Sequence, residues 1–404
     1  MRYAILGLAL LAWPTMAGAQ EVRLGAGFQP HLATEAAVSL FGVSNYRASE
    51  RNRRFNDLYA KAEIATALHL AEGFSVQAVI KFEPFAGGPD RGQDRAFQDQ
   101  GAFIESLFAE WQPIERVTFQ AGKFTAPFGY GPEGFPGIRL RDWSESYEIS
   151  ESLGFGVAVT VIDDAEGVGA HTLSAAIFTL DTTSLSSSAI TRKRFGRDEA
   201  ERFSRNSRGQ GGPGNTGRLN SWALALDGDQ MAWLPGFTYH AAILSRGAGR
   251  DGTAREWGYA IGAQQTITWN EEWRTLLFAE AVQFRNSGGR PRTEITTIMP
   301  DPVTGDPVES IEDAVIGERR TITTLGARTS HGPWRSTLAW QTDRRARTVS
   351  SVPRESYTEF TVGRELAFGF TVDVGVSRAR YGRDEGSPGT VDAALGLLSW
   401  RASF

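Results

Sequence analysis

Residues 61 to 83 read KAEIATALHLAEGFSVQAVIKFE, and two alternating segments meet within them at a turn of residues 71–73. Antiparallel pairing across this turn brings one apolar face together, with the predicted pairs Leu70 and Phe74, Leu68 and Val76, Ile64 and Ile80, and Ala62 and Phe82. The opposite face carries two predicted pairs of opposite charge, Lys61 with Glu83 and Glu63 with Lys81. One face of this hairpin therefore suits lipid and the other suits water, unless a bulge in the turn shifts the register by one residue.

The same alternation of apolar with polar or small residues recurs along the chain, in segments of about ten residues. Sixteen segments have this character: residues 35–44, 57–70, 74–83, 102–112, 116–124, 152–163, 170–180, 218–227, 237–246, 255–269, 273–285, 320–331, 334–344, 355–366, 369–381 and 390–404. Segment 22–28 is also extended in character, so a count of eighteen stays open. The pattern predicts an all-β fold, a transmembrane antiparallel β-barrel of sixteen strands.

The connections between these segments alternate between short turns and long polar loops. The predicted turns are residues 71–73, 112–115, 270–272, 331–333 and 367–368, and the predicted loops are residues 84–101, 125–151, 181–217, 286–319 and 382–389. Outer-membrane barrels place short turns on the periplasmic side and long loops outside the cell. Tryptophans gather beside the predicted turns, as in the aromatic girdle of such a barrel, at Trp111, Trp233, Trp269, Trp273 and Trp334.

The amino terminus has the three parts of a secretory signal peptide. A charged start at Arg2 leads into an apolar run over residues 4–13, and Ala17-Gly18-Ala19 forms a small-x-small cleavage site. This apolar run is shorter than the roughly 20 residues that a membrane-spanning helix needs. We therefore expect a signal peptide over residues 1–19, a single barrel domain over residues 20–404, and a location in the outer membrane of a Gram-negative bacterium.

Composition and motifs give little support to an enzyme. The 404 residues include 45 Gly, 24 Phe and no Cys, which excludes disulfides and thiolate metal sites, and a net charge of −5 predicts no nucleic-acid partner. The five histidines lack metal-ligand spacing, and the Gly-x-Gly-x-x-Gly match at residues 209–214 lies in a predicted loop rather than between a strand and a helix. We expect no catalytic residues, no metal and no cofactor. A barrel enzyme with a rim cluster, or a structural barrel with a plugged lumen, stay open as alternatives.

The last strand ends in residues 394–404, ALGLLSWRASF, which place Leu398, Trp400, Ala402 and Phe404 on one face. This ending resembles the signal by which the barrel-assembly machinery recognises outer-membrane proteins. The resemblance implies that Trp400 and Phe404 act in assembly, with that machinery as a partner.

A second resemblance covers roughly residues 57–160. Ala109-Glu110-Trp111 is followed by AGKFTAPFG at residues 121–129, and this order is similar to that in the phosphate-selective porin O and P family. The resemblance implies a sixteen-stranded homotrimer with the loop after the fifth strand folded into the pore. The arginine and lysine ladder of that family has no counterpart that we can align, so phosphate selectivity does not carry over.

That loop, residues 125–151, holds Arg139 and Arg141 against Glu133, Asp142, Glu145, Glu148 and Glu151, a net charge of −3. An empty barrel of sixteen strands is a wide aqueous channel, so a constriction is needed to restrict what passes. We expect Arg139 and Arg141 to face Asp142, Glu145 or Glu148 across a narrow eyelet, and Lys61, Glu63, Lys81 and Glu83 to line the pore. The predicted function is passive diffusion of small hydrophilic solutes or ions, with a weak preference for cations. Outer-membrane lipid and lipopolysaccharide are the expected surroundings.

Overall fold

A computed structural model describes residues 28–84, 92–131, 134–188, 190–191, 205–289, 292–300, 307–315, 317–347, 354–382 and 388–404. The predicted signal peptide and Glu133 lie outside the described residues.

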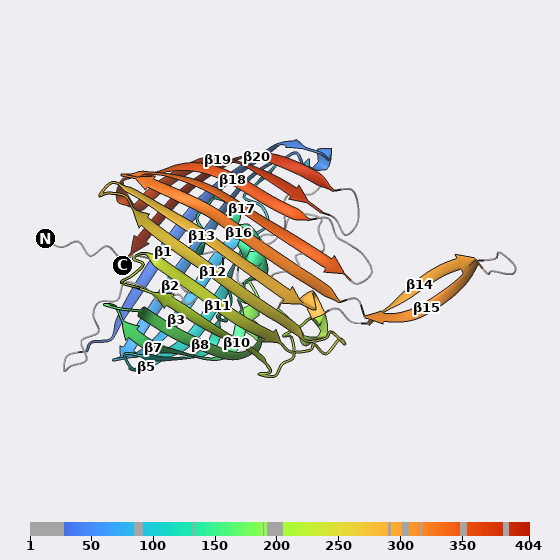
Figure 1. Ribbon diagram of the computed structural model, residues 1–404, viewed down its shortest axis with the longest axis horizontal. Coiled ribbons are helices and arrows are strands. Elements are labelled where there is room, and N and C mark those ends of the chain that lie inside the picture. Colours follow the sequence, from blue (N-terminus) through green and yellow to red (C-terminus); the bar gives the residue numbers. More distant parts are fainter. Residues whose placement is uncertain are drawn as a thin grey trace.

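Sixteen long strands form the wall of one closed antiparallel β-barrel (Figure 1). They are β1 (His31–Ala48), β2 (Asn56–Ala71), β3 (Phe74–Pro84), β5 (Gln100–Ile114), β6 (Val117–Phe124), β7 (Ser152–Asp164), β8 (Gly169–Leu180), β10 (Ser221–Asp229), β11 (Phe237–Arg246), β12 (Glu256–Thr268), β13 (Trp273–Arg285), β16 (Glu318–His331), β17 (Trp334–Arg347), β18 (Glu355–Glu365), β19 (Phe370–Tyr381) and β20 (Gly389–Ser403). The last strand pairs with the first, from Glu35 with Ser403 to Ala48 with Val391, and this pairing closes the barrel. The predicted sixteen-stranded barrel is thereby confirmed, one long strand for each predicted segment.

The remaining elements belong to the connections. Two-residue strands β4 (Arg95–Ala96) and β9 (Ile190–Thr191) extend the sheet beside β2 and β5, and β14 (Arg292–Pro300) and β15 (Pro307–Val315) form a separate hairpin. The helical elements are α1 (Leu140–Ser144) and the 3-10 turns η1 (Arg51–Arg53), η4 (Glu145–Tyr147), η5 (Ser184–Ser186), η7 (Arg208–Gln210), η8 (Ser287–Gly289) and η9 (Ala367–Gly369). No helix among the described residues is long and apolar enough to cross a membrane.

The two ends of the barrel differ in the length of their connections. His31 pairs with His69 beside the turn that joins β2 to β3, and the amide of Phe404 donates to the carbonyl of Thr34 at 2.8 Å, so both described chain ends lie at the short-turn end. The β14–β15 hairpin projects from the opposite end (Figure 1). Short and long connections are therefore sorted to opposite ends, as the alternation in the sequence predicts.

The hairpin of β2 and β3 shows where the predicted register holds and where it fails. Three apolar pairs occur as predicted, Ala62 with Phe82, Ile64 with Ile80 and Leu68 with Val76, and so does the pair of Glu63 with Lys81. The predicted pair of Leu70 with Phe74 is wrong, because Ala71 pairs with Phe74 after a bulge that follows His69. The turn itself is only two residues long, with Gly73 at a φ of 65° that favours glycine, and the bulge absorbs the extra residue.

The outer and inner faces of the wall have opposite chemistry. Alternate residues such as Ile261, Leu338 and Val374 point outward and are more than half exposed. The other set points inward and includes polar and charged side chains that are nearly fully buried, such as Glu280 and Glu359 at 3% and 1% exposure. A soluble protein would bury its apolar face and expose its polar one. This wall does the reverse, which is the arrangement of a transmembrane barrel.

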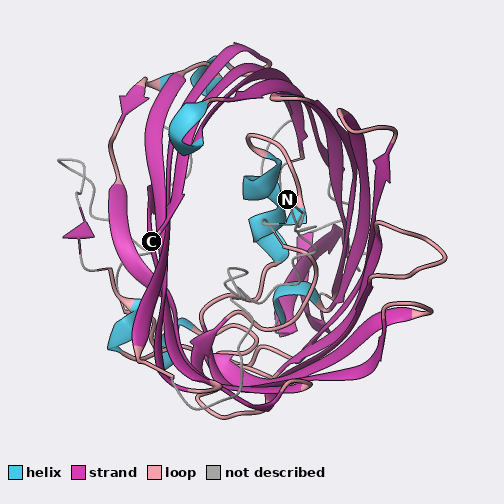
Figure 2. Cartoon of the chain, turned by 90° about the vertical axis from the view of Figure 1, so that its left-hand side faces the viewer, coloured by secondary structure: helices cyan, strands magenta, loops and turns pink. Residues whose placement is uncertain are grey.

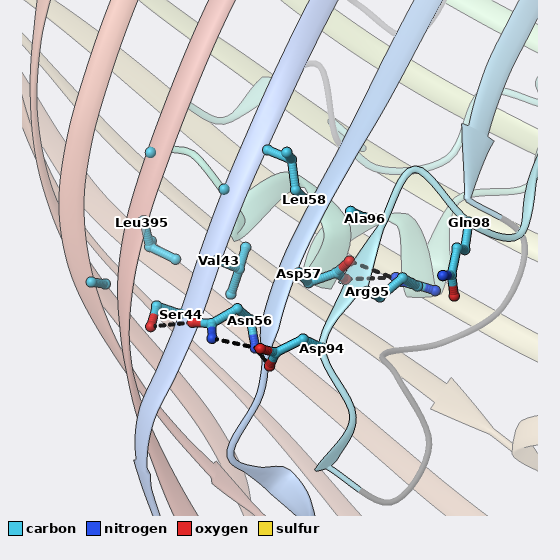
Figure 3. Close-up of a pocket in the computed structure, with 13 residues that line it drawn as sticks. Val43, Ser44, Asn56, Asp57, Leu58, Asp94, Arg95, Ala96, Gln98 and Leu395 are labelled. Atoms are coloured by element: carbon cyan, nitrogen blue, oxygen red, sulfur yellow. Dashed lines mark hydrogen bonds and ion pairs between the residues drawn. The ribbon is translucent and has the colours of Figure 1, made fainter.

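One cavity of 640 Å³ lies against the strands where the barrel closes, between β20, β1 and β2 (Figure 3). Residues 94–98 form its other side, where Arg95 binds both carboxylate oxygens of Asp57 at 2.8 and 2.6 Å. This buried ion pair fixes β4 to the edge of β2, beyond the point where β3 ends. None of the predicted pore residues lines this cavity.

Candidate pore and constriction loop

The long connection between β6 and β7, here called the inner loop (residues 125–151), folds into the space enclosed by the wall. Its neck is closed by a hydrogen bond from the amide of Ala126 to the carbonyl of Ile149 at 3.0 Å. Helix α1 and the turn η4 belong to this loop and lie within the ring of strands when the barrel is viewed along its axis (Figure 2). The loop is thus a structure inside the barrel rather than a cover at its rim.

Aromatic side chains dock the inner loop on one side of the wall. Phe128 packs against Phe284 of β13 at 5.5 Å between ring centroids, and Phe135 packs against Phe278 of the same strand at 5.3 Å. Tyr147 is 2% exposed within the same cluster. Burying an aromatic ring contributes about 1.5–3 kcal/mol, so these rings hold the loop firmly.

Two glutamates of the barrel wall accept hydrogen bonds from backbone amides of the inner loop. Glu280 of β13 accepts hydrogen bonds from the amide of Tyr130 at 2.7 Å and from the hydroxyl of Tyr147. Glu359 of β18 accepts from the amides of Ile138 and Arg139 at 2.9 and 3.0 Å. Because the amides of an irregular loop need partners when they are buried, each carboxylate both fixes the loop and satisfies its backbone.

A histidine provides a third attachment. His240 of β11 accepts the amide proton of Gly129 on Nε2 at 2.9 Å, and its Nδ1 lies 2.5 Å from a carboxylate oxygen of Asp227. The side chain is 1% exposed. The two ring nitrogens of His240 therefore join the inner loop to Asp227 of β10.

The tip of the inner loop reaches the other side of the barrel. Ile138 is buried against Phe41, Tyr59 and Leu395, which lie on β1, β2 and β20. Trp143 stacks on Tyr357 of β18 at 5.1 Å. The loop therefore runs from its docking site on β11 and β13 to the strands at which the barrel closes.

Lys61 of β2 links the wall to the acidic residues of the loop. Its Nζ lies 2.9 Å from Oδ1 of Asp142, 3.2 Å from Oε1 of Glu145 and 3.8 Å from Glu83 of β3. Lys81 of β3 makes a similar contact to Glu105 of β5 at 2.7 Å and a longer one to Glu63 at 3.9 Å. The four charged residues named from the hairpin thus lie on the inner face, where Lys61 joins Glu83 to the acidic residues of the inner loop and Lys81 joins Glu63 to Glu105.

Arg139 lies beside one of the acidic residues that it was predicted to face. Its Nε lies 3.5 Å from Asp142, three residues further along the same loop, and Asp142 also binds Lys61 of β2. Arg141 and Glu148 also interact with neighbouring residues. The ion pairs of this region therefore join the loop to itself and to β2.

The two loop carboxylates differ in their proton affinity. Burial raises the pKa of Glu145, and the attraction of Lys61 opposes this rise without cancelling it. For Asp142, burial is outweighed by Lys61 and Arg139 together, so its pKa lies below the ordinary range. Of the two, Glu145 is the carboxylate that takes up a proton first as the pH falls.

Several residues that hold the loop were not identified from the sequence. Glu280 and His240 each stand among mostly small or apolar residues on a strand, and a lone polar residue at an inward position was the available signal. Glu359 shares β18 with the charged residues Glu355, Arg364 and Glu365, so it carried no such signal. Lys123, within the Gly-Lys-Phe motif, is fully buried between Glu151 and Asp181, at 3.3 and 3.2 Å. This ion triad fixes the neck of the inner loop, and gives that motif a structural role.

The remaining predicted residues lie at the short-turn end. Trp400 pairs with Val38 of β1 and with Phe370 of β19, and Phe404 is exposed at the end of the chain. Among the described residues, no group of three or more His, Asp or Glu side chains is placed to hold a metal ion.

No family model matches this chain, and no curated protein does either. Among solved structures, an anion-selective porin from Comamonas acidovorans aligns with a TM-score of 0.50 and 7% identity, over 93% of this chain and 99% of that one. The outer-membrane channel DcaP of Acinetobacter baumannii aligns with a TM-score of 0.48 and 12% identity, over 92% and 96% of the two chains. At these identities the likeness concerns the fold, and this chain has the fold of a porin barrel.

Proposed function

We propose that this protein is an outer-membrane porin of a Gram-negative bacterium, a passive diffusion channel for small hydrophilic solutes or ions. The observation that carries the proposal is a closed barrel with an apolar outer face, a polar inner face and a polar loop folded inside it. In hydrocarbon every backbone group must be paired, and a closed barrel achieves this without an open sheet edge.

The proposed path passes beside the ion pairs that join the inner loop to β2, along the charged inner faces of β3 and β5. Lys61, Asp142 and Glu145 retain 24%, 23% and 36% of their side-chain exposure, so water reaches this network. Arg139 is 32% exposed beside them. The proposed lining residues are Lys61, Glu63, Lys81, Glu83, Arg139, Arg141, Asp142, Glu145 and Glu148.

The charge balance of this network favours cations. The ion pairs join five carboxylates, Glu63, Glu83, Glu105, Asp142 and Glu145, to three cations, Lys61, Lys81 and Arg139, which leaves a net charge of −2. In a passage about as wide as the ~8 Å Debye length these charges are incompletely screened. We propose a weak preference for cations, in contrast to the anion-selective porin from Comamonas acidovorans.

The finer predictions from the sequence complete this proposal. They are export by a signal peptide over residues 1–19, insertion by the barrel-assembly machinery through Trp400 and Phe404, and assembly as a homotrimer. The resemblance to phosphate-selective porins supports the trimer and the constriction loop, but not phosphate as the solute.

Liposome swelling and reversal potentials test the function together. Liposomes containing the protein should swell in sugars up to a size limit, whereas a barrel that is plugged by its inner loop would give no swelling at any size.

In a salt gradient, the double variant Arg139→Ala with Arg141→Ala should shift the reversal potential toward greater cation preference. The matched control is Arg116→Ala with Arg364→Ala, which removes two exposed arginines near the short-turn end and should leave the potential unchanged. An unchanged reversal potential and conductance in the first variant would remove these arginines from the path.

A further inference from the structure

A row of arginines lies on the outer face of the barrel near its long-loop end. Six exposed side chains belong to it, on neighbouring strands or just before one, and we call them the arginine belt: Arg285, Arg319, Arg344, Arg354, Arg378 and Arg380. On β19 the belt directly follows the exposed apolar residues Val372, Val374 and Val376, which share its face. The belt therefore lies at the edge of the apolar band.

Two members of the belt stand directly opposite each other. Arg285 of β13 and Arg319 of β16 are cross-strand partners, a position in which like charges are destabilising. Both line a cavity of 360 Å³ together with Arg347 and Glu318. Glu318 forms an ion pair with Arg347 at 2.7 Å, so the carboxylate in this cavity is already engaged by another arginine.

The other members of the belt have little acidic compensation in the described part of the chain. Arg378 lies 3.6 Å from Asp392. Arg354 lies over the ring of Trp340 at 5.5 Å, a contact that holds the guanidinium near the surface without neutralising it. An anion bound at the edge of the apolar band relieves the repulsion among positive charges that are concentrated at that depth.

We propose that the arginine belt binds the phosphate groups of an anionic glycolipid in the outer leaflet, with Arg285 and Arg319 as its central pair. Guanidinium groups bind phosphate through paired hydrogen bonds, and two opposed arginines beside a cavity can share one phosphate. The acyl chains of such a lipid would lie along the apolar residues below the belt. A lipid, rather than free phosphate, fits because the charged and apolar parts of this surface are continuous. The inference rests on the proposed membrane location and not on conduction.

The test measures binding of lipid A, a diphosphorylated glucosamine disaccharide with acyl chains, to the full-length protein in detergent. The double variant Arg285→Ala with Arg319→Ala should weaken binding by about tenfold or more, since the loss of even one charged hydrogen bond is worth that factor. The matched control, Arg116→Ala with Arg364→Ala, removes the same charge from exposed positions near the short-turn end and should bind within about twofold of the parent.

Three outcomes would overturn the proposal. One is equal binding of lipid A and of its dephosphorylated form, and another is full competition by inorganic phosphate at the same concentration as the lipid. The third is a variant that changes its oligomeric state in size-exclusion chromatography without losing lipid, which would make the belt a contact between copies of this chain. Channel recordings on the same samples separate this test from that of the proposed function, because a protein without conductance could still bind lipid A through the belt.

Discussion

Replacing Glu359 by alanine should release the tip of the inner loop from the wall. Glu359 is 1% exposed and accepts three hydrogen bonds, from the amides of Ile138 and Arg139 at 2.9 and 3.0 Å and from the hydroxyl of Tyr357 at 2.7 Å. A hydrogen bond to a charged group contributes about 1.5–3 kcal/mol. Only the two amide bonds join the loop to the wall, because Tyr357 lies on β18 together with Glu359. With the lower value for each amide bond, because water in the lumen can replace part of it, the loss is about 3 kcal/mol. That free energy shifts the equilibrium between docked and released tip by about a hundredfold.

Single-channel recording in planar bilayers measures the consequence. Glu359→Ala should give a larger and noisier conductance than the parent, because the tip moves while Glu280 and His240 still hold the base of the loop. Glu359→Gln keeps an acceptor oxygen without the charge, so its conductance and noise should lie between those of the parent and those of Glu359→Ala. Glu365→Ala is the matched control, since this glutamate lies on the same strand with its side chain 66% exposed. If Glu359→Ala reproduced the conductance and noise of the parent, the tip of the loop would not border the conducting path.

The remaining predictions concern the wall and the charge of the path. A hydrophilic thiol reagent should modify Lys81→Cys and spare Ile80→Cys in membrane-embedded protein; the opposite result would mean that the register of β3 is off by one residue. Cation preference should decrease as the pH falls through the raised pKa of Glu145, and Glu145→Gln should remove this part of the pH dependence of the reversal potential; a dependence of the same size in the variant would exclude Glu145 from the path. Leu338→Arg puts a charge on the middle of the outer face and should cost about 2–4 kcal/mol of unfolding free energy in lipid vesicles, and Leu338→Ala much less; equal losses would place Leu338 outside the hydrocarbon.

Local pattern was sufficient to predict the barrel. The alternation of apolar and polar residues follows from the two faces of a strand, and so each predicted segment identifies a strand without knowledge of its neighbours. The same rule predicts the register of β2 and β3 at Ile64 and Ile80. It fails at Leu70, because a bulge depends on how the turn at Gly73 is closed and not on the alternation.

The contacts that attach the inner loop to the wall could not be predicted from the local alternation of residues. Its composition indicated a docked, charged loop, but Glu359 lies 221 positions from Ile138 in the sequence, and no local pattern joins the two. The eyelet of Arg139 and Arg141 opposite Asp142, Glu145 or Glu148 stays a prediction. It did not include Lys61, the wall residue that binds Asp142 and Glu145. Residues that point inward from a strand could be named from the sequence, whereas the contacts among them depend on the closed shape of the barrel.

A recording of the purified protein in a planar lipid bilayer tests the central claim most directly. If the barrel is a water-filled passage narrowed by the inner loop, it should insert in discrete steps of uniform conductance, and Glu359→Ala should enlarge that step. Insertion into the bilayer without any conductance, in the parent and in Glu359→Ala alike, would contradict a diffusion channel and leave a barrel with a plugged lumen.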